Sequence, residues 1–234
     1  MISIVIPTLN EEQNLKKLLP YLDQVQSGLI SEIIISDGDS SDNTIDVASN
    51  FDCMICHCSK KGRAYQMNEG AKLAKGSVLF FLHADTFPPP NFDQTIYKAW
   101  GHGAGAGSFQ LEFDDASWLL SLYSWFTRFK STLVRFGDQG LFVDPELFRA
   151  VGGFDESLVV MEDQEIVRRM KKVSRFQVID KTVVTSAEKY RRIGIVKLQF
   201  IFSIIFLMYY AGARQETMVH LYKSLIGNSA DDNR

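Results

Sequence analysis

The residues best suited to chemistry follow short apolar runs. One run, Ser77–Leu82, comes after Gly76 and leads into His83-Ala84-Asp85, and three prolines follow shortly after. An apolar run this short is typical of a strand buried on both faces of a parallel sheet. Ligands of open α/β sheets bind beyond the carboxyl ends of such strands, and carboxylate oxygens suit Mg²⁺ or Mn²⁺. We therefore predict that Asp85 binds a divalent metal.

Two other apolar runs also end in polar residues. Ile2–Ile6 leads into Pro7-Thr8-Leu9-Asn10-Glu11, and Ile33–Ile35 leads into an acidic turn that contains Asp37 and Asp39. A helical pattern follows each turn, and Asn10 is expected to cap the first helix. Strands joined by right-handed helical crossovers are parallel, so the three polar segments are expected to line one pocket at one edge of the sheet.

A pair of adjacent acids, Glu162 and Asp163, opens a later helical pattern that ends in basic residues. The helix dipole favours carboxylates in a first turn, so the pair is explained either by capping or by catalysis. As a catalytic group, either acid can take a proton from a hydroxyl. Arg168 and Arg169 either orient these acids, bind phosphate or lie on a solvated helix face.

The bulk composition limits the classes of protein. The chain has 234 residues, of which 46% are hydrophobic, and this favours one α/β domain with an appendage. Its net charge of -3 argues against a nucleic-acid-binding surface. The start of the chain shows no secretory signal, so a cytoplasmic location is expected. Cys53, Cys56 and Cys58 lie in a strand-like stretch and are expected to be free structural thiols.

Three remaining segments have simple structural explanations. Gly101–Gly107 is expected to be a connector, because it lacks the Lys of a phosphate-binding loop. Trp118–Phe129 is predicted to be an aromatic helix that packs in the core or serves as a platform for an apolar acceptor or a bilayer. The apolar run Leu198–Ala213 is shorter than the roughly 20 residues that span a membrane. It is expected to pack on its own domain, form a dimer or touch a membrane surface.

The motifs together resemble family 2 glycosyltransferases of the GT-A fold, and the short bacterial members in particular. The resemblance runs from Ile2 to about Tyr222 and rests on motifs in matching order and spacing. These motifs are Pro7–Glu11, Ser36–Ser40, Gly62-Arg63 with Asn68–Ala71, Phe81–Asp85, Gly137-Asp138-Gln139-Gly140 and Glu162-Asp163.

The resemblance implies an α/β fold with a single Rossmann-like mixed sheet flanked by helices and a C-terminal apolar helical segment. Residues 1–192 would form the catalytic domain, with a nucleotide half in 1–100 and an acceptor half in 101–192. Residues 193–234 would form a helical extension that packs on the domain, forms a dimer or contacts a membrane surface.

The resemblance also implies roles for individual residues. The UDP- or GDP-linked sugar donor would be bound by residues at the first strand ends, namely Pro7, Thr8, Leu9, Asn10, Glu11, Asp37, Asp39, Gly62, Arg63, Ala84 and Asp85. Asp85 would ligate Mn²⁺ or Mg²⁺. Asp138, Gln139 and Arg168 would lie on the side of the acceptor or donor sugar. Asp163 would be the catalytic base, with Glu162 as the alternative.

The implied reaction is metal-dependent, inverting transfer of a sugar to an acceptor hydroxyl. The acceptor is unidentified, and a lipid-linked one would suit a protein peripheral at the cytoplasmic membrane. The chain departs from the family pattern because His83 replaces the first acid of the usual Asp-x-Asp motif, and Gly38 replaces an acid of the second motif. A non-catalytic nucleotide-sugar-binding module is therefore the alternative, and a nucleotidyltransferase is a weaker one.

Overall fold

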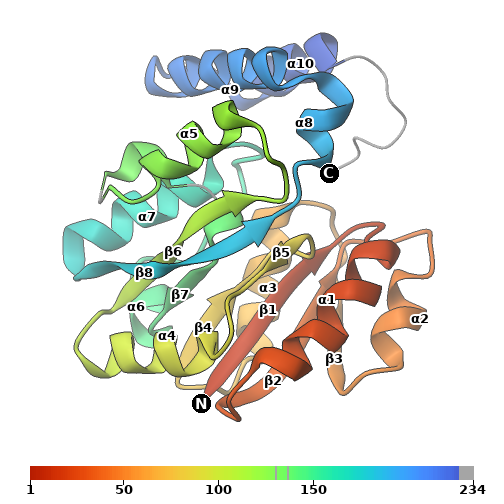
Figure 1. Ribbon diagram of the computed structural model, residues 1–234, viewed down its shortest axis with the longest axis vertical. Helices are drawn as coiled ribbons and strands as arrows, with labels where there is room; N and C mark the ends of the chain where they lie inside the picture. The colour runs from red at the N-terminus through yellow and green to blue at the C-terminus, as the bar shows by residue number, and fades with distance from the viewer. Residues whose placement is uncertain (130, 136, 227–234) are drawn as a thin grey trace.

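The first half of the chain forms the parallel part of a mixed sheet (Figure 1). The computed structural model describes residues 1–129, 131–135 and 137–226. Strands β1 (Ile2–Thr8), β2 (Ile30–Asp37), β3 (Cys53–His57) and β4 (Val78–Phe81) lie in the order β3-β2-β1-β4 and are parallel. Helices α1 (Glu12–Val25), α2 (Thr44–Ser49) and α3 (Arg63–Leu73) connect them. The predicted strand-helix alternation is confirmed.

The register of these strands brings their polar ends together. Thr8 at the end of β1 is paired with Asp37 of β2, and Asp37 is paired with His57 of β3. Val5 of β1 is paired with Phe81, the last residue of β4, so His83–Asp85 follow at the same edge. This edge is the one that the sequence predicted.

The second half of the chain extends the same sheet with antiparallel and parallel pairs. Strand β7 (Leu141–Val143) pairs antiparallel with β4 and with β6 (Ala106–Phe113). Strand β8 (Phe176–Thr185) is parallel to β6, and the short β5 (Thr86–Phe87) pairs with β8. The full order is β3-β2-β1-β4-β7-β6-β8-β5. Between the strands lie α4 (Phe92–Gly101), α5 (Trp118–Phe126), α6 (Pro145–Ala150), α7 (Glu162–Val173) and the short turns η1 (Thr132–Val134) and η2 (Gly137–Gln139).

Helices cover both faces of the sheet. The sequence of β4 is apolar throughout because its side chains are buried on both faces. Phe80 packs with Phe92 of α4 in one core cluster, which α1 and α2 also enter. Phe81 points to the other face and packs with Phe148 of α6 and Phe154, in the cluster that α3 and α7 enter. Each residue of β4 is buried, as expected for a strand covered on both faces.

The C-terminal helices form a third cluster across one end of the molecule (Figure 1). They are α8 (Glu188–Ile193), α9 (Ile195–Tyr210) and α10 (Gln215–Ile226). Leu198, Ile201 and Ile205 of α9 pack against Met218 of α10. No helix in the described part of the chain is long and apolar enough to cross a membrane.

Local details differ from the sequence predictions at two places. Asn10 does not cap α1, which begins at Glu12; its backbone is left-handed (φ 57°), and its side-chain oxygen accepts a hydrogen bond from the Ser41 N–H instead. The expected connector is shorter than predicted, because α4 continues to Gly101 and β6 begins at Ala106. The three cysteines are free, as expected, and β3 holds Cys53 and Cys56.

Candidate functional site

The loops after β1 and β2 are fastened to each other by hydrogen bonds. The Thr8 hydroxyl donates to Asp37 Oδ1 (3.0 Å), and the Ser40 N–H donates to Asp37 Oδ2 (2.8 Å). The Glu11 N–H donates to the Thr44 hydroxyl (2.8 Å). Asp37 is buried, and its carboxylate holds the loop in place. Asp39, in contrast, is exposed and has a left-handed backbone (φ 69°).

Gln66 binds the backbone at the ends of β1 and β2, and this supporting role was not predicted. From α3, its amide nitrogen donates to the carbonyls of Thr8 (2.6 Å) and Ser36 (2.8 Å). A Cβ at Gly38 would lie within 3.0 Å of the Gln66 side chain, so this turn fits tightly over Gln66. The sequence signal was weak, because a Gln on a helix is most often a surface residue.

Arg63 links the N-terminal part of the chain, residues 1–100, to the acid pair. It is the first residue of α3, after Gly62, whose φ of 137° favours glycine. Its Nη1 lies 3.3 Å from Glu162 Oε1. Partial burial lowers the pKa of Arg63, but the charges of Glu162, Asp163, Asp138 and Asp85 more than offset this and raise it. Residues distant in sequence therefore share one electrostatic site.

The two adjacent acids have different surroundings. Glu162 is 3% exposed, and its burial, together with the charge of Asp163, raises its pKa to about 7. Burial also raises the pKa of Asp163, although the charges of His83 and Arg63 oppose this. The Asp163 carboxylate accepts a hydrogen bond from the Gly137 N–H and, with Ser108 and Gly140, lines a small cavity. Met161, just before the pair, has a left-handed backbone (φ 70°) that turns the chain into α7.

His83 and Asp138 form a pair beside these acids. His83 Nδ1 lies 2.8 Å from Asp138 Oδ1. Burial and the charge of Arg63 lower the pKa of His83, but the hydrogen bond to Asp138 and the charges of Asp138 and Asp163 together outweigh them and raise it. A Cβ on Gly137 would collide with both Asp163 and the His83 ring. Only glycine therefore fits at this point, where η2 packs between the segment after β4 and the start of α7.

The surroundings of Asp85 fit a divalent cation. Asp85 lies in the turn after β4, where its carbonyl accepts from the Ser186 N–H (3.2 Å) and its carboxylate from the Thr86 hydroxyl (3.5 Å). The charges of four carboxylates raise the pKa of Arg63, so acidic groups outnumber basic groups at this site. In residues 1–129, 131–135 and 137–226, no group of three His, Cys, Asp or Glu residues is arranged to hold a metal alone. A divalent cation at this site would be held by the Asp85 carboxylate together with oxygens of a diphosphate and water.

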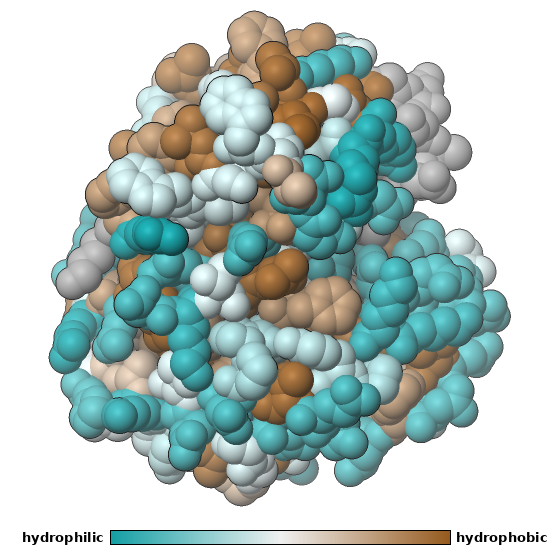
Figure 2. All heavy atoms as spheres, in the orientation of Figure 1, coloured by the Kyte–Doolittle hydropathy of each residue, from teal (hydrophilic) through white to brown (hydrophobic). Residues whose placement is uncertain are grey.

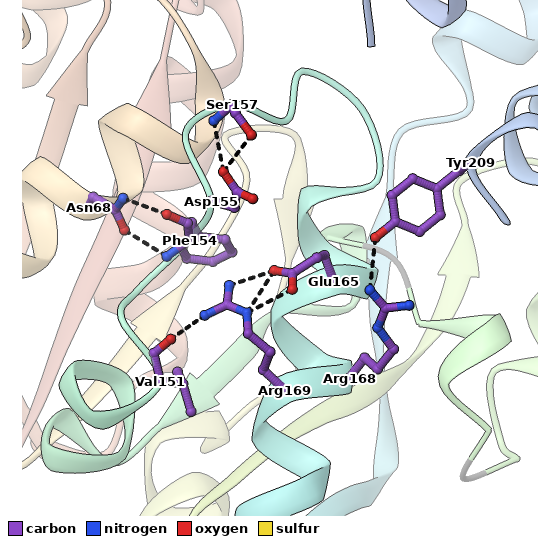
Figure 3. Close-up of polar contacts among 9 residues, drawn as sticks. All are labelled: Asn68, Val151, Phe154, Asp155, Ser157, Glu165, Arg168, Arg169 and Tyr209. Atoms are coloured by element: carbon purple, nitrogen blue, oxygen red, sulfur yellow. Dashed lines mark hydrogen bonds and ion pairs between the residues drawn. The ribbon is translucent and has the colours of Figure 1, made fainter. Parts of the chain in front are cut away.

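Two predicted residues lie in other surroundings. Gln139 is buried, where it accepts from Arg135 Nη1 (2.6 Å) and donates to the Val134 carbonyl (2.7 Å). Arg168 lies against Tyr209 of α9, 3.3 Å from its hydroxyl (Figure 3). The neighbouring Arg169 binds Glu165 and the Val151 carbonyl (Figure 3). Among the described residues, neither arginine forms a hydrogen bond or ion pair with Glu162 or Asp163.

Sequence comparison shows which known proteins the chain resembles. The model of the family described as glycosyl transferase family 2 matches residues 3–151. Dolichol-phosphate mannosyltransferase from Pyrococcus furiosus is 32% identical over 108 residues, which cover 44% of this chain and 31% of that protein. The 4,4'-diaponeurosporenoate glycosyltransferase from Staphylococcus haemolyticus is 32% identical over 91 residues, 36% of this chain and 24% of that protein. The match thus spans about a third or less of these relatives.

Solved structures share the fold. The mannosyltransferase PcManGT from Pyrobaculum calidifontis, in complex with GDP-Man and Mn²⁺, aligns with a TM-score of 0.71 at 14% identity over 96% of this chain and 69% of that one. Glucosyl-3-phosphoglycerate synthase from Mycobacterium tuberculosis, in complex with Mn²⁺ and UDP, aligns with a TM-score of 0.62 at 15% identity over 91% of this chain and 80% of that one.

Proposed function

The chain belongs to glycosyl transferase family 2 and has the GT-A fold, and we propose that it transfers a sugar from a nucleotide-sugar donor to an acceptor hydroxyl. The observation that carries this proposal is the meeting of Arg63, His83, Asp138 and the Glu162-Asp163 pair beside the strand ends. A nucleotide edge and a buried acid pair at one site suit the binding of a donor and the removal of a proton from an acceptor.

The donor is proposed to be a UDP- or GDP-linked sugar bound by the nucleotide half, residues 1–100. The solved structures with this fold that carry GDP-Man or UDP support this assignment. The exposed Asn10 and Asp39, the strand ends from Pro7 to Glu11 and Gly62-Arg63 face the donor in this proposal. Asp85 would hold Mn²⁺ or Mg²⁺, which when bound neutralises charge on the departing nucleoside diphosphate.

Asp163 is proposed to be the general base in a single inverting displacement. Its carboxylate lines a small cavity and is oriented by the Gly137 N–H, while Glu162 is paired with Arg63. Asp163 removes the proton of the acceptor hydroxyl, and the oxygen attacks the anomeric carbon as the nucleotide leaves. Glu162 holds Arg63, and His83 holds Asp138 on the acceptor half, residues 101–192.

The acceptor is proposed to be lipid-linked and the enzyme to be cytoplasmic. The names of the relatives, which refer to dolichol-phosphate and diaponeurosporenoate, support a lipid acceptor. The free thiols Cys53, Cys56 and Cys58 suit a reducing compartment. Residues 193–234 are proposed to extend the catalytic domain, and the separate cluster in which α9 and α10 pack together supports this.

A panel of UDP-, GDP- and other nucleotide-sugars, each with and without Mn²⁺, tests the donor assignment by thermal unfolding. A donor that binds the native state raises the Tm by mass action. We expect one nucleotide class to raise it, more strongly with Mn²⁺, and Asp85→Ala to remove the Mn²⁺ effect. If no nucleotide shifts the Tm in either condition, the proposed function is wrong.

A non-catalytic nucleotide-sugar-binding module is the second candidate, because His83 replaces the first acid of the Asp-x-Asp motif that is usual in the family. It predicts the same Tm shifts but no chemistry. Transfer or slow donor hydrolysis that requires Mn²⁺ and is lost in Asp163→Ala excludes this module. Donor binding without either reaction, across a panel of lipid and sugar acceptors, would favour it.

A further inference from the structure

Helix α5 and the turn after it expose a row of large apolar side chains. Trp118, Leu122, Trp125 and Phe129 follow one another at intervals of four, three and four residues, the spacing of one helix face. All four are exposed, Trp118 to 72%. The rings of Trp125 and Phe129 meet edge to face at 5.0 Å between centroids, so the row is continuous at its end. We call these residues the α5 stripe.

Helix α9 exposes a second row. Val196, Phe200, Leu207 and Tyr210 recur at helical intervals, and the first three are 70%, 65% and 67% exposed. Its opposite side is also apolar and packs against α10. A helix that is apolar all round is normally enclosed by protein or lipid, yet one side of α9 faces outward. We call the four exposed residues the α9 stripe.

A buried glutamine connects the α9 stripe to the segment that follows the α5 stripe. Gln164 of α7 accepts from the Tyr210 hydroxyl (3.5 Å) and donates to the carbonyl of Leu133 (3.2 Å). Leu133 follows the α5 stripe and is itself exposed. Brown and tan atoms gather over the upper part of the face in Figure 2, where α5, α9 and α10 lie. Monomeric soluble proteins rarely expose so many large apolar residues together.

The charge around the stripes is positive although the chain is acidic overall. Residues 118–135 and 189–214, which contain both stripes, hold eight of the 25 Lys and Arg residues and none of the 28 Asp and Glu residues. Of these, Arg135 is buried and Arg191 is paired with Asp114, whereas Arg128, Lys197 and Arg214 are exposed. Two copies of such a face would repel each other, whereas an anionic lipid surface would attract it. Trp and Tyr side chains are also suited to the headgroup level of a bilayer.

We propose that the α5 and α9 stripes together bind the surface of an anionic lipid bilayer without crossing it. The proposal goes beyond sugar transfer, because it requires only the folded chain and no donor. It also has a consequence for the site. The chain runs from Leu133 at the edge of this surface to Gly137 and Asp138 at the acids, so a bilayer-bound face brings the site close to hydroxyls at the headgroup level.

Vesicle sedimentation of the full chain tests the proposal. We expect at least about tenfold stronger binding to phosphatidylcholine vesicles that contain phosphatidylglycerol than to phosphatidylcholine alone, and weaker binding in high salt. Two double variants, Trp125→Ser with Phe129→Ser and Phe200→Ser with Leu207→Ser, should each weaken binding about tenfold. The matched control, Leu73→Ser with Val173→Ser, removes exposed apolar side chains elsewhere and should bind as the wild type does.

Tryptophan fluorescence gives a second measurement that needs no stripe variant. Trp100 is half-buried and donates to Asp144 (2.9 Å), and Trp100→Phe leaves only Trp118 and Trp125. Brominated anionic lipids should quench these two and shift their emission to the blue. An unchanged spectrum, equal binding by the stripe and control variants, or no binding to anionic vesicles overturns the proposal. A lipid-free dimer that the stripe variants abolish would assign the face to a second copy instead. The nucleotide Tm shifts are measured separately, so failure here is distinguishable from failure of the proposed function.

Discussion

At the scale of single residues, the neighbours of Glu162 and Asp163 assign them different tasks. Glu162 pairs with Arg63, and Asp163 faces the cavity beside Gly137. We expect Asp163→Asn to lower kcat by about 10²- to 10⁴-fold with little change in donor affinity, because a general base is lost. Glu162→Gln should retain more turnover and raise the donor KM, because Arg63 loses its charged partner.

Initial rates together with donor binding by calorimetry measure this difference. Arg63→Lys serves as a matched variant, since it keeps the charge and should raise the donor KM in the same direction as Glu162→Gln. If Glu162→Gln reduces kcat more than Asp163→Asn does, the two roles are exchanged.

The raised pKa of Glu162 also makes stability depend on pH. Its pKa is about 7 in the folded chain, above the usual glutamate value of 4.5. Between these values the folded state holds a proton that the unfolded state has released, so stability falls as pH rises through this window. Glu162→Gln has no such proton. We expect the Tm of the variant, relative to the wild type, to increase from about pH 5 to about pH 8.

Thermal unfolding at both pH values checks this expectation, with the exposed Glu112→Gln as the control for loss of a charge. A Tm difference that is the same at both pH values would show that Glu162 ionises as readily in the folded chain as in the unfolded one.

At the scale of elements, Arg135 holds the segment that carries Asp138 to the site. The buried guanidinium donates to Gln139 (2.6 Å), to the Ser108 hydroxyl of β6 (3.2 Å) and to the carbonyls of Thr127 and Phe129. These acceptors are neutral, and burial lowers the pKa of Arg135 to about 10. The arginine thus replaces backbone pairing in a segment with little regular structure.

Loss of Arg135 should leave buried oxygens without donors. We expect Arg135→Met to lower the free energy of unfolding by about 2–4 kcal/mol, since each buried carbonyl left without a donor costs about 1–3 kcal/mol. Urea unfolding measures this loss, and the exposed Arg128→Met is the control. An equal effect of the two variants would show that the Arg135 hydrogen bonds contribute little to stability.

The strands were predictable because burial on both faces leaves a clear apolar pattern, as in β4. The polar strand ends were predictable because parallel strands share an edge. The supporting residues were not, since Gln66 and Arg135 are polar types that usually lie on the surface, and only the folded chain brings them to the carbonyls they bind. The predicted cap at Asn10 was wrong because its side chain binds Ser41, 31 residues away in the sequence. Helix-capping patterns consider only neighbouring residues and therefore do not include this partner.

At the scale of the whole molecule, the site depends on contacts between halves that are distant in sequence. Asn68 of α3 donates to the Phe154 carbonyl and accepts from the Phe154 N–H, both at 2.9 Å (Figure 3). Arg63 of the same helix reaches Glu162. Helix α3 therefore positions both the loop before α7 and the ends of β1 and β2, where the donor is proposed to bind.

The C-terminal helices reach the same loop from the other side. Gln215 of α10 accepts from the N–H groups of Val159 (3.1 Å) and Val160 (3.2 Å) and donates to the Val160 carbonyl (3.4 Å). This backbone leads directly into the left-handed Met161 and the acid pair. We expect Gln215→Ala to lower kcat about three- to tenfold with unchanged donor affinity, because the acids lose their fixed position.

Steady-state rates and donor calorimetry separate the two effects of Gln215→Ala. Ser224→Ala, an exposed position on the same helix, is the matched control and should leave kcat unchanged. If Gln215→Ala weakens donor binding as strongly as it lowers kcat, the C-terminal helices act on the nucleotide half as well. If neither changes, the loop before α7 is held by Asn68 and Arg63 alone, and the helical extension has no part in the chemistry.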